Sequence, residues 1–179
     1  LGLLTDVVVE YLSAQVRAGC QILQVFEAMG AHISAAAFER WALPRLQDIA
    51  AELKRRHPSV PLMVFPRGAC HSLVALQTAG YDVVTADCSI DLGKAARALC
   101  SEAANKGQLM AALQGNFDPR LLRPGEGATV ATVREAVRSM LESVGPGVRL
   151  IANLGEGLGG TESPELVAAF VDAVHELSS

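Results

Sequence analysis

The chain has 179 residues, half of them hydrophobic and 19% charged, a composition typical of folded globular domains. Its formal net charge of −4 leaves no surplus of cations for nucleic acid or an anionic membrane surface. No apolar run approaches the roughly 18 residues that a membrane span needs, so we expect one soluble domain over residues 1–179, with no nucleic acid partner and no membrane insertion.

The chain starts at Leu1 rather than Met, inside a predicted helix from Leu4 to Arg17, and we expect a fragment or a processed chain. After this helix, short apolar runs alternate with stretches of helical periodicity. The runs predict strands, buried on both faces, at about Gln21–Phe26, Pro61–Phe65, Asp82–Ala86, Met110–Gln114 and Arg149–Asn153. The other stretches predict helices at about Ala35–Arg56, Ser72–Ala79, Leu92–Asn105, Val130–Val144 and Pro164–Leu177.

This alternation is the pattern of a parallel sheet covered by crossover helices. Five βα units are compatible with an open doubly wound sheet or with part of a (β/α)₈ barrel, and periodicity does not separate the two. As part of a barrel, the five units would be incomplete and would leave hydrophobic edges for another chain to cover.

Functional groups in both architectures gather where parallel strands end. Five short segments follow the predicted strands: Glu27–Gly30, Pro66–His71, Asp87–Ser89, Gly115–Pro119 and Leu154–Gly160. Arg67 directly follows a buried strand, where it could receive a substrate carboxylate or form a surface ion pair. Asn116 and Asp118 could line a pocket or shape their own turn, and turn shaping is favoured because Asn and Asp hydrogen-bond locally.

Three of these segments raise the question of ion binding. The glycines from Gly155 to Gly160 could cradle an anion with their amides or form a tight turn, and Glu156 would repel an anion. Cys70, His71, Cys88 and Asp87 carry the side chains that zinc prefers, but adjacent residues seldom reach one metal, so packing is favoured. We expect no metal. The four cysteines, which include Cys20 and Cys100, lack CxxC spacing and are expected to be thiols in a reducing compartment.

Several long stretches of the chain resemble uroporphyrinogen decarboxylases, in the C-terminal part of that family's sequence. The stretches are LLTDVVVEYLSAQVRAGCQILQVFE, ALPRLQDIAAELKRR, LQTAGYDVVTAD, LQGNFDP, RLIANLGEGL and SPELVAAFVDAVHE. The resemblance implies five closing βα units of a (β/α)₈ TIM barrel, which is usually a homodimer.

It also implies decarboxylation of the four acetate side chains of uroporphyrinogen to give coproporphyrinogen, for heme or chlorophyll. No metal or organic cofactor takes part, because a protonated pyrrole of the substrate accepts the electrons. The expected partners are the tetrapyrrole polycarboxylate and a second chain that completes the barrel. We expect Phe26, Arg67, Asn116, Asp118 and Glu156 to contact the substrate.

The sequence departs from the family pattern in ways that bear on activity. The family's early segments, with the aspartate that grips the pyrrole nitrogens, have no counterpart here. A family hydroxyl position is Ala28, and a family histidine position is Glu156, so no catalytic residue is assigned. The stretch from Cys100 to Gly107 is expected to be an added loop.

Two other functions stay open beside decarboxylation by a completed barrel. One is a catalytically inactive structural subunit derived from a decarboxylase, suggested by Ala28 and Glu156. The other is a zinc-dependent methyltransferase of the same superfamily, but such enzymes are expected to use a His-x-Cys pair with a later cysteine, and none follows Cys100. The expected compartment is the cytoplasm, with plastid or mitochondrion as alternatives.

Overall fold

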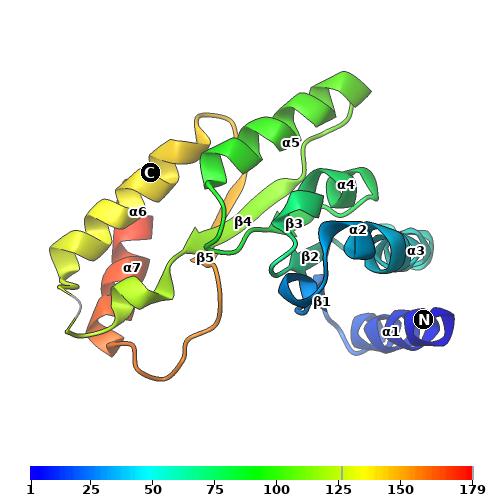
Figure 1. Cartoon of the computed structure of the whole chain (residues 1–179), viewed down its shortest axis with the longest axis horizontal. Coiled ribbons are helices and arrows are strands. Elements are labelled where there is room, and N and C mark those ends of the chain that lie inside the picture. The colour runs from blue at the N-terminus through cyan, green and yellow to red at the C-terminus, as the bar shows by residue number, and fades with distance from the viewer. Residues whose placement is uncertain (126, 179) are drawn as a thin grey trace. The chain divides into compact units, whose positions relative to one another are not determined.

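The computed structural model describes residues 1–125 and 127–178, in which strands alternate with helices along the chain (Figure 1). The helices are α1 Gly2–Arg17, α2 Ala35–Ala37, α3 Leu43–Arg56, α4 Leu73–Thr78, α5 Leu92–Lys106, α6 Val130–Val144 and α7 Pro164–Leu177. The strands are β1 Leu23–Glu27, β2 Leu62–Pro66, β3 Val83–Thr85, β4 Ala112–Phe117 and β5 Leu150–Leu154. Short 3₁₀ turns lie at Gly30–His32, Cys70–Ser72 and Pro119–Leu122.

Two compact units make up the chain, the first from residues 1–85 and 98–112, the second from residues 86–97 and 113 onward. In the first unit, β1 pairs with β2 and β2 with β3, all parallel, and Glu27 lies opposite Pro66 at the end of the β1–β2 register. Leu62, Val64 and Val84 are almost fully buried there. Burial of such side chains supplies most of the stability of a parallel sheet.

The helix predicted over Ala35–Arg56 is divided by a π turn at Phe38–Ala42, between α2 and α3. Pro44 accounts for the division, because it has no amide hydrogen to continue the α-helical ladder. Ser34 begins the segment by accepting a hydrogen bond from the amide of Ala37 at 3.2 Å.

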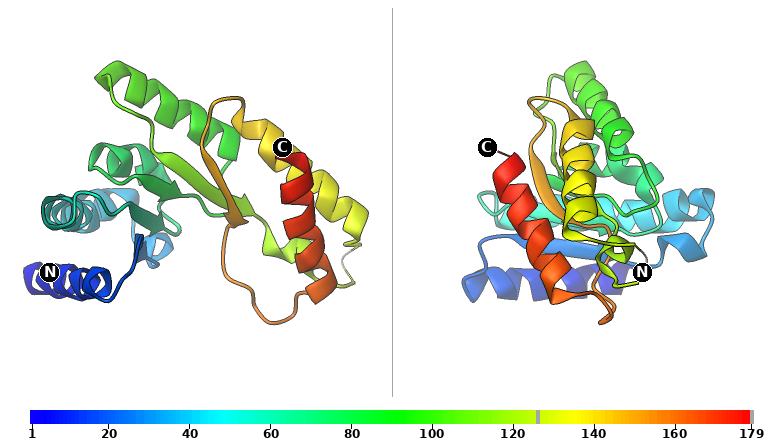
Figure 2. Two further views of the ribbon diagram at one scale, coloured as in Figure 1. Left: turned by 180° about the vertical axis from the view of Figure 1, so that it is seen from behind. Right: turned by 90° about the vertical axis from the view of Figure 1, so that its left-hand side faces the viewer.

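In the second unit, β4 and β5 pair in parallel from Leu113 opposite Leu150 to Phe117 opposite Leu154. Helices α6 and α7 lie side by side in both views of Figure 2. The rings of Phe117 and Phe170 pack with centroids 4.8 Å apart and join β4 to α7. Thr129 and Thr132 form a reciprocal capping box at the start of α6.

Three further sequence expectations are wrong. The fourth strand ends at Phe117 rather than Gln114, since pairing with β5 extends through Asn116 and Phe117. Burial on both faces does not hold for β5, where side chains are alternately half-buried and exposed, or for β1, where Phe26 is exposed. The stretch from Cys100 is no added loop but belongs to α5, because its alanines favour helix and Ala103 is buried, and the helix ends before Gly107.

Among the described residues, no helix combines the length and apolarity that crossing a membrane requires.

Candidate functional site

In the first unit, the ends of β1 and β2 bring Phe26 and Arg67 to one edge of the sheet. The amide of Arg67 donates to the carbonyl of Glu27 at 2.9 Å, which continues the β1–β2 ladder by one bond. The Arg67 side chain is exposed, and its Nη2 donates to the carbonyl of Ala28 at a long 3.4 Å. The Phe26 ring is 68% exposed and stands edge-on to Phe65. A cation and an aromatic face are therefore both open to a ligand here.

Two glycines lock the loops that follow β1 and β2. A Cβ on Gly30 would lie 2.6 Å from Cβ of Ala69, and a Cβ on Gly68 would lie 2.6 Å from Cβ of Ala31. Gly68 also has a φ of +77°, which side chains other than hydrogen rarely allow. The close approach of the two loops fixes the position of the Arg67 main chain relative to that of Ala28.

Glu27 is a residue of this edge that sequence reasoning did not single out. Its Oε1 accepts a hydrogen bond from the amide of Met29 at 3.2 Å, while Oε2 is buried without a hydrogen-bond partner among the described residues. A buried carboxylate oxygen is costly unless a donor meets it. Its only sequence signal was an acid at the end of a buried strand.

Cys70 and His71 also belong to the first unit. His71 is exposed and its ring stands edge-on to Phe38, with centroids 5.5 Å apart. Within residues 1–125 and 127–178, no three His, Cys, Asp or Glu side chains are grouped so that they could hold a metal. All four cysteines are thiols.

In the second unit, Asn116 and Asp118 border one cavity of about 250 Å³ beside α6. Asn116 Nδ2 donates to the carbonyls of Asp87 and Ile90 at 2.8 and 2.9 Å. The Asn116 amide group thus shapes the segment after β3, and its remaining polar atom is the carbonyl oxygen.

Asp118 is held by Arg120. The guanidinium donates to both carboxylate oxygens at 2.6 to 3.0 Å, and the Arg120 amide donates to Oδ1 at 2.9 Å. The hydrogen bond from the Arg120 side chain is the main reason that the pKa of Asp118 lies below its usual range, against a smaller opposing effect of burial. Asp118 is therefore an ionised carboxylate, paired on its own turn.

Cys88, in the segment that follows β3, is in close contact with Gly155, the residue that follows β5. Gly155 is buried and its amide donates to the carbonyl of Phe117 at 2.8 Å, while a Cβ on Gly155 would lie 2.6 Å from the amide nitrogen of Cys88. Burial first, then the charges of Asp118 and Glu156, raise the pKa of the Cys88 thiol. This edge is acidic, because Asp87 adds to the same effect.

Two main-chain amides of the glycine-rich loop after β5 donate hydrogen bonds to Glu162, a side chain of the same loop. The amides of Gly160 and Thr161 donate to Glu162 Oε2 at 2.9 and 3.1 Å, and Glu162 Oε1 accepts from Arg123 Nε at 3.0 Å. These amides therefore already hold a carboxylate. Neither Arg123 nor Glu162 stood out in the sequence, since the two are 39 positions apart and form no motif.

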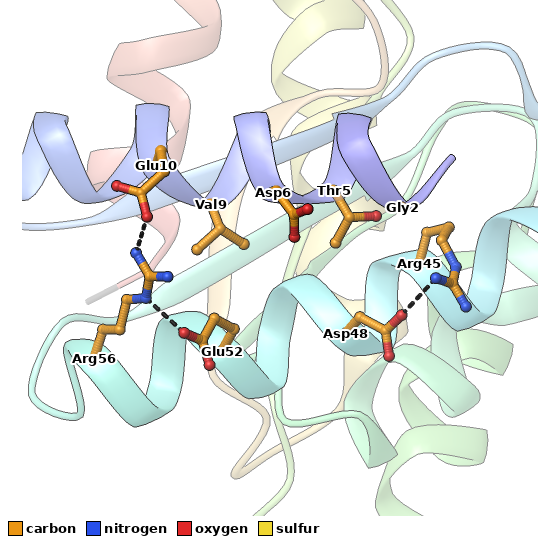
Figure 3. Close-up of a pocket in the computed structure, with 9 residues that line it drawn as sticks. All are labelled: Gly2, Thr5, Asp6, Val9, Glu10, Arg45, Asp48, Glu52 and Arg56. Carbon is orange, nitrogen blue, oxygen red and sulfur yellow. Dashed lines mark hydrogen bonds and ion pairs between the residues drawn. The ribbon is translucent and has the colours of Figure 1, made fainter.

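A groove of about 490 Å³ runs between α1 and α3 in the first unit (Figure 3). Arg56 donates to Glu10 of α1 and, at 2.7 Å, to Glu52 of α3. Arg45 pairs with Asp48 at 3.0 Å. The Arg56–Glu10 pair crosses the groove and joins the two helices, whereas the other two pairs lie within α3, so we interpret the groove as a contact between helices.

The uroporphyrinogen decarboxylase (URO-D) family model matches residues 1–177 of this chain. Uroporphyrinogen decarboxylases of Salinibacter ruber, Dictyostelium discoideum and Mus musculus are 41%, 38% and 40% identical to it over 174, 179 and 183 residues. These matches cover 97 to 99% of this chain and 46% of each relative. The chain spans about half the length of the curated relatives it matches.

Among solved structures, a methyltransferase from Methanosarcina mazei superposes with a TM-score of 0.76 and 20% sequence identity, over 98% of this chain and 48% of that one. At this identity the likeness concerns the fold alone. With the family match, it confirms the predicted class of five βα units from the barrel type of these decarboxylases.

Proposed function

This chain belongs to the uroporphyrinogen decarboxylase family, and from that membership we propose that it is the C-terminal part of a barrel that decarboxylates the acetate side chains of uroporphyrinogen to give coproporphyrinogen. The observation that carries the proposal is the unbroken family match over residues 1–177 at about 40% identity to named decarboxylases. The same continuity supports residues 1–179 as one domain of that barrel.

The remaining strands come from a second polypeptide or from further sequence of the same protein. An uncovered apolar face on α1 supports this: Leu3, Val7 and Tyr11 are 77%, 56% and 66% exposed. Those side chains recur at positions that share one face of a helix. Monomeric proteins rarely leave such a face in water.

Each expected residue is assigned a distinct task within its own unit. Arg67 binds a substrate carboxylate, since its guanidinium is exposed beside the β1 and β2 ends. Phe26 offers an apolar face to a pyrrole ring. Asn116 and Asp118 define the wall of the cavity in the second unit, and Glu156 faces the substrate from the glycine-rich loop.

The reaction depends more on the position of the substrate and on the charges around it than on a reactive side chain. Carbon dioxide leaves as the electrons of its bond flow into a protonated pyrrole, so the protein must hold that ring and the carboxylates in place. We propose no cofactor for this reaction. The thiol state of the cysteines fits a cytoplasmic location, where glutathione keeps such groups reduced.

A second candidate is a catalytically inactive subunit kept for assembly. Ala28 provides no hydroxyl at the β1 end, and Glu156 adds a negative charge to an edge where Asp87 and Asp118 already act on Cys88. A polycarboxylate meets repulsion there, worth about 1 to 4 kcal/mol for each close carboxylate pair.

A chimera separates the two functions. The matching 174-residue segment of the Salinibacter ruber decarboxylase is replaced by this chain, and coproporphyrinogen formation from uroporphyrinogen is measured. An active chimera supports the decarboxylase. A folded but inactive chimera that gains activity with Ala28→Ser and Glu156→His supports the inactive subunit, and a folded chimera that stays inactive with both changes contradicts the proposed site.

A further inference from the structure

The loop between β5 and α7 is fastened at both ends within the second unit. At its start, the amide of Gly155 donates to the carbonyl of Phe117 at 2.8 Å. At its end, the amide of Ser163 donates to the carbonyl of Leu122 at 2.8 Å. Glu156 to Gly160 form an exposed arch between these two points.

Glu162 is the central group of the second fastening. Its side chain is only 2% exposed, and its two carboxylate oxygens accept the three hydrogen bonds described above, from Arg123 and from the amides of Gly160 and Thr161. Burial alone would raise the pKa of Glu162, but Arg123 and the amides lower it overall, so the carboxylate stays charged. A buried, charged carboxylate whose two oxygens both accept hydrogen bonds holds the loop in place, unlike a solvated carboxylate on the surface.

Arg123 contributes from the segment that follows β4. Its side chain is 34% exposed, which leaves the guanidinium partly shielded from water. A Cβ on Gly159 would lie 3.4 Å from Arg123 Nη2, so the guanidinium also lies against the arch itself. Arg123 therefore links the β4–α6 connection to the β5–α7 loop.

We propose that Arg123 and Glu162 are positioning residues: they brace the β5–α7 loop and thereby hold in place Glu156, the residue that follows Gly155 in its close contact with Cys88, at the strand ends of the second unit. The inference rests on the proposed function in one respect, namely that these strand ends face the substrate. The brace sets how strongly the negative charge of Glu156 is felt by a substrate carboxylate. It is thus a determinant of substrate affinity that makes no contact with substrate.

The carboxylate must stand at position 162 for this brace to work. The amides of Gly160 and Thr161 are donors and need an acceptor, which an arginine at that position cannot provide. A simple surface ion pair would tolerate exchange of the two charged residues. The brace does not.

Cys88 provides a reporter that needs no substrate. The charged groups that act on its thiol are Asp118, Glu156, Asp87 and, with opposite sign, Arg120. Iodoacetamide labelling of the full chain at pH 8, resolved by peptide mass spectrometry, gives the rate at Cys88, with the exposed thiols of Cys20 and Cys100 as internal references. Glu156→Gln is expected to raise the Cys88 rate roughly twofold, because removal of one nearby charge lowers the thiol pKa by a few tenths.

The decisive experiment is a double-mutant cycle. Glu162→Gln raises the Cys88 rate by the same route as Glu156→Gln, so the double variant labels no faster than Glu156→Gln alone. Additive effects, or no effect of Glu162→Gln, would overturn the proposal, since a general loosening acts whether or not position 156 is charged. If Glu162→Gln does not fold, Arg123→Gln, which removes a single bond of the brace, takes its place in the cycle.

Two further variants sharpen the result. Glu135→Gln removes an exposed pairing with Arg138 in the same unit and leaves the Cys88 rate unchanged. The double variant Arg123→Glu with Glu162→Arg is expected not to restore the wild-type labelling rate of Cys88. Restoration would show that the brace is an ordinary ion pair.

In the chimera, Glu162→Gln lowers the KM for uroporphyrinogen with little change in kcat. If the effects of Glu156→Gln and Glu162→Gln on the Cys88 rate are coupled but the chimera is inactive, only the decarboxylase proposal is contradicted. If the two effects are additive but the chimera is active, only the brace is contradicted.

Discussion

The side-chain amide of Asn116 donates to the main-chain carbonyl of Asp87 at 2.8 Å, and this bond ties the end of β4 to the segment that follows β3. The same nitrogen donates to Ile90 at 2.9 Å. A residue expected to contact substrate therefore shapes the wall of the site with its donor group. Its oxygen is the atom left to meet a ligand.

Replacement of Asn116 tests this role. Asn116→Ala leaves two carbonyls without their donor and should lower the free energy of unfolding by about 1 to 3 kcal/mol. Asn116→Asp should cost more, because a carboxylate then faces both carbonyls. Urea denaturation followed by circular dichroism measures the difference, and Asn105→Ala, at an exposed position near the end of α5, is the matched control. Equal stability of Asn116→Ala and wild type would show that these bonds contribute nothing.

Gly155 is expected to tolerate no side chain. A Cβ there would lie 2.6 Å from the Cys88 amide nitrogen and closer still to its Sγ, so Gly155→Ala forces main-chain movement and should destabilise the protein by about 1 to 3 kcal/mol. Gly157→Ala, two residues along the same loop, has no atom within 4 Å of its Cβ and should be neutral. Thermal unfolding of both variants checks the contrast. Cys88→Ala should rescue Gly155→Ala only partly, since the main-chain clash remains.

Arg67→Gln separates affinity from stability. Because the side chain is exposed and makes one long bond to Ala28, its loss should leave the urea midpoint nearly unchanged. In the chimera with the Salinibacter ruber decarboxylase, it should raise the KM for uroporphyrinogen about tenfold or more, as expected for one lost charge-assisted contact. Arg97→Gln, an exposed arginine on α5, serves as control. An unchanged KM would remove Arg67 from the proposed site.

The ion pairs that Glu52 makes with Arg55 and Arg56 within α3 should be lost in acid. Hydrogen bonds from Arg55 and Arg56 lower the pKa of Glu52 from 4.5 to about 2. A carboxyl group with a lowered pKa in the folded state stabilises the fold above its unfolded value, and that contribution is lost as the pH falls from about 4.5 to about 2. The urea midpoint of wild type should therefore approach that of Glu52→Gln over this range, and 1 M salt should reduce the difference at pH 6. A constant difference down to pH 2 would contradict the assignment, and Glu142→Gln should follow wild type throughout.

Local signals explain which elements were predictable. Val130–Val144 and Pro164–Leu177 agree with the structure to the residue, because Gly145 and Ser163-Pro164 mark helix ends within a few positions. The fourth strand was predicted too short, since pairing with β5 carries it through Phe117. The π turn before α3 depends on Pro44, whose effect on the helical hydrogen bonds is not visible in the periodicity of the apolar residues.

The sequence by itself determined the α/β class, the order of the strands and helices, and the family, because burial periodicity and capping act over a few residues and family motifs are read in order. Tertiary structure alone decided the partners of the polar groups: Asn116 with Asp87, Arg123 with Glu162, and Gly155 against Cys88. These pairs are separated by 29, 39 and 67 positions, and no local pattern encodes which charges and hydrogen-bonding groups meet. Such contacts form only when the strands that carry them are placed side by side, and they set the charge that a ligand would meet in the second unit.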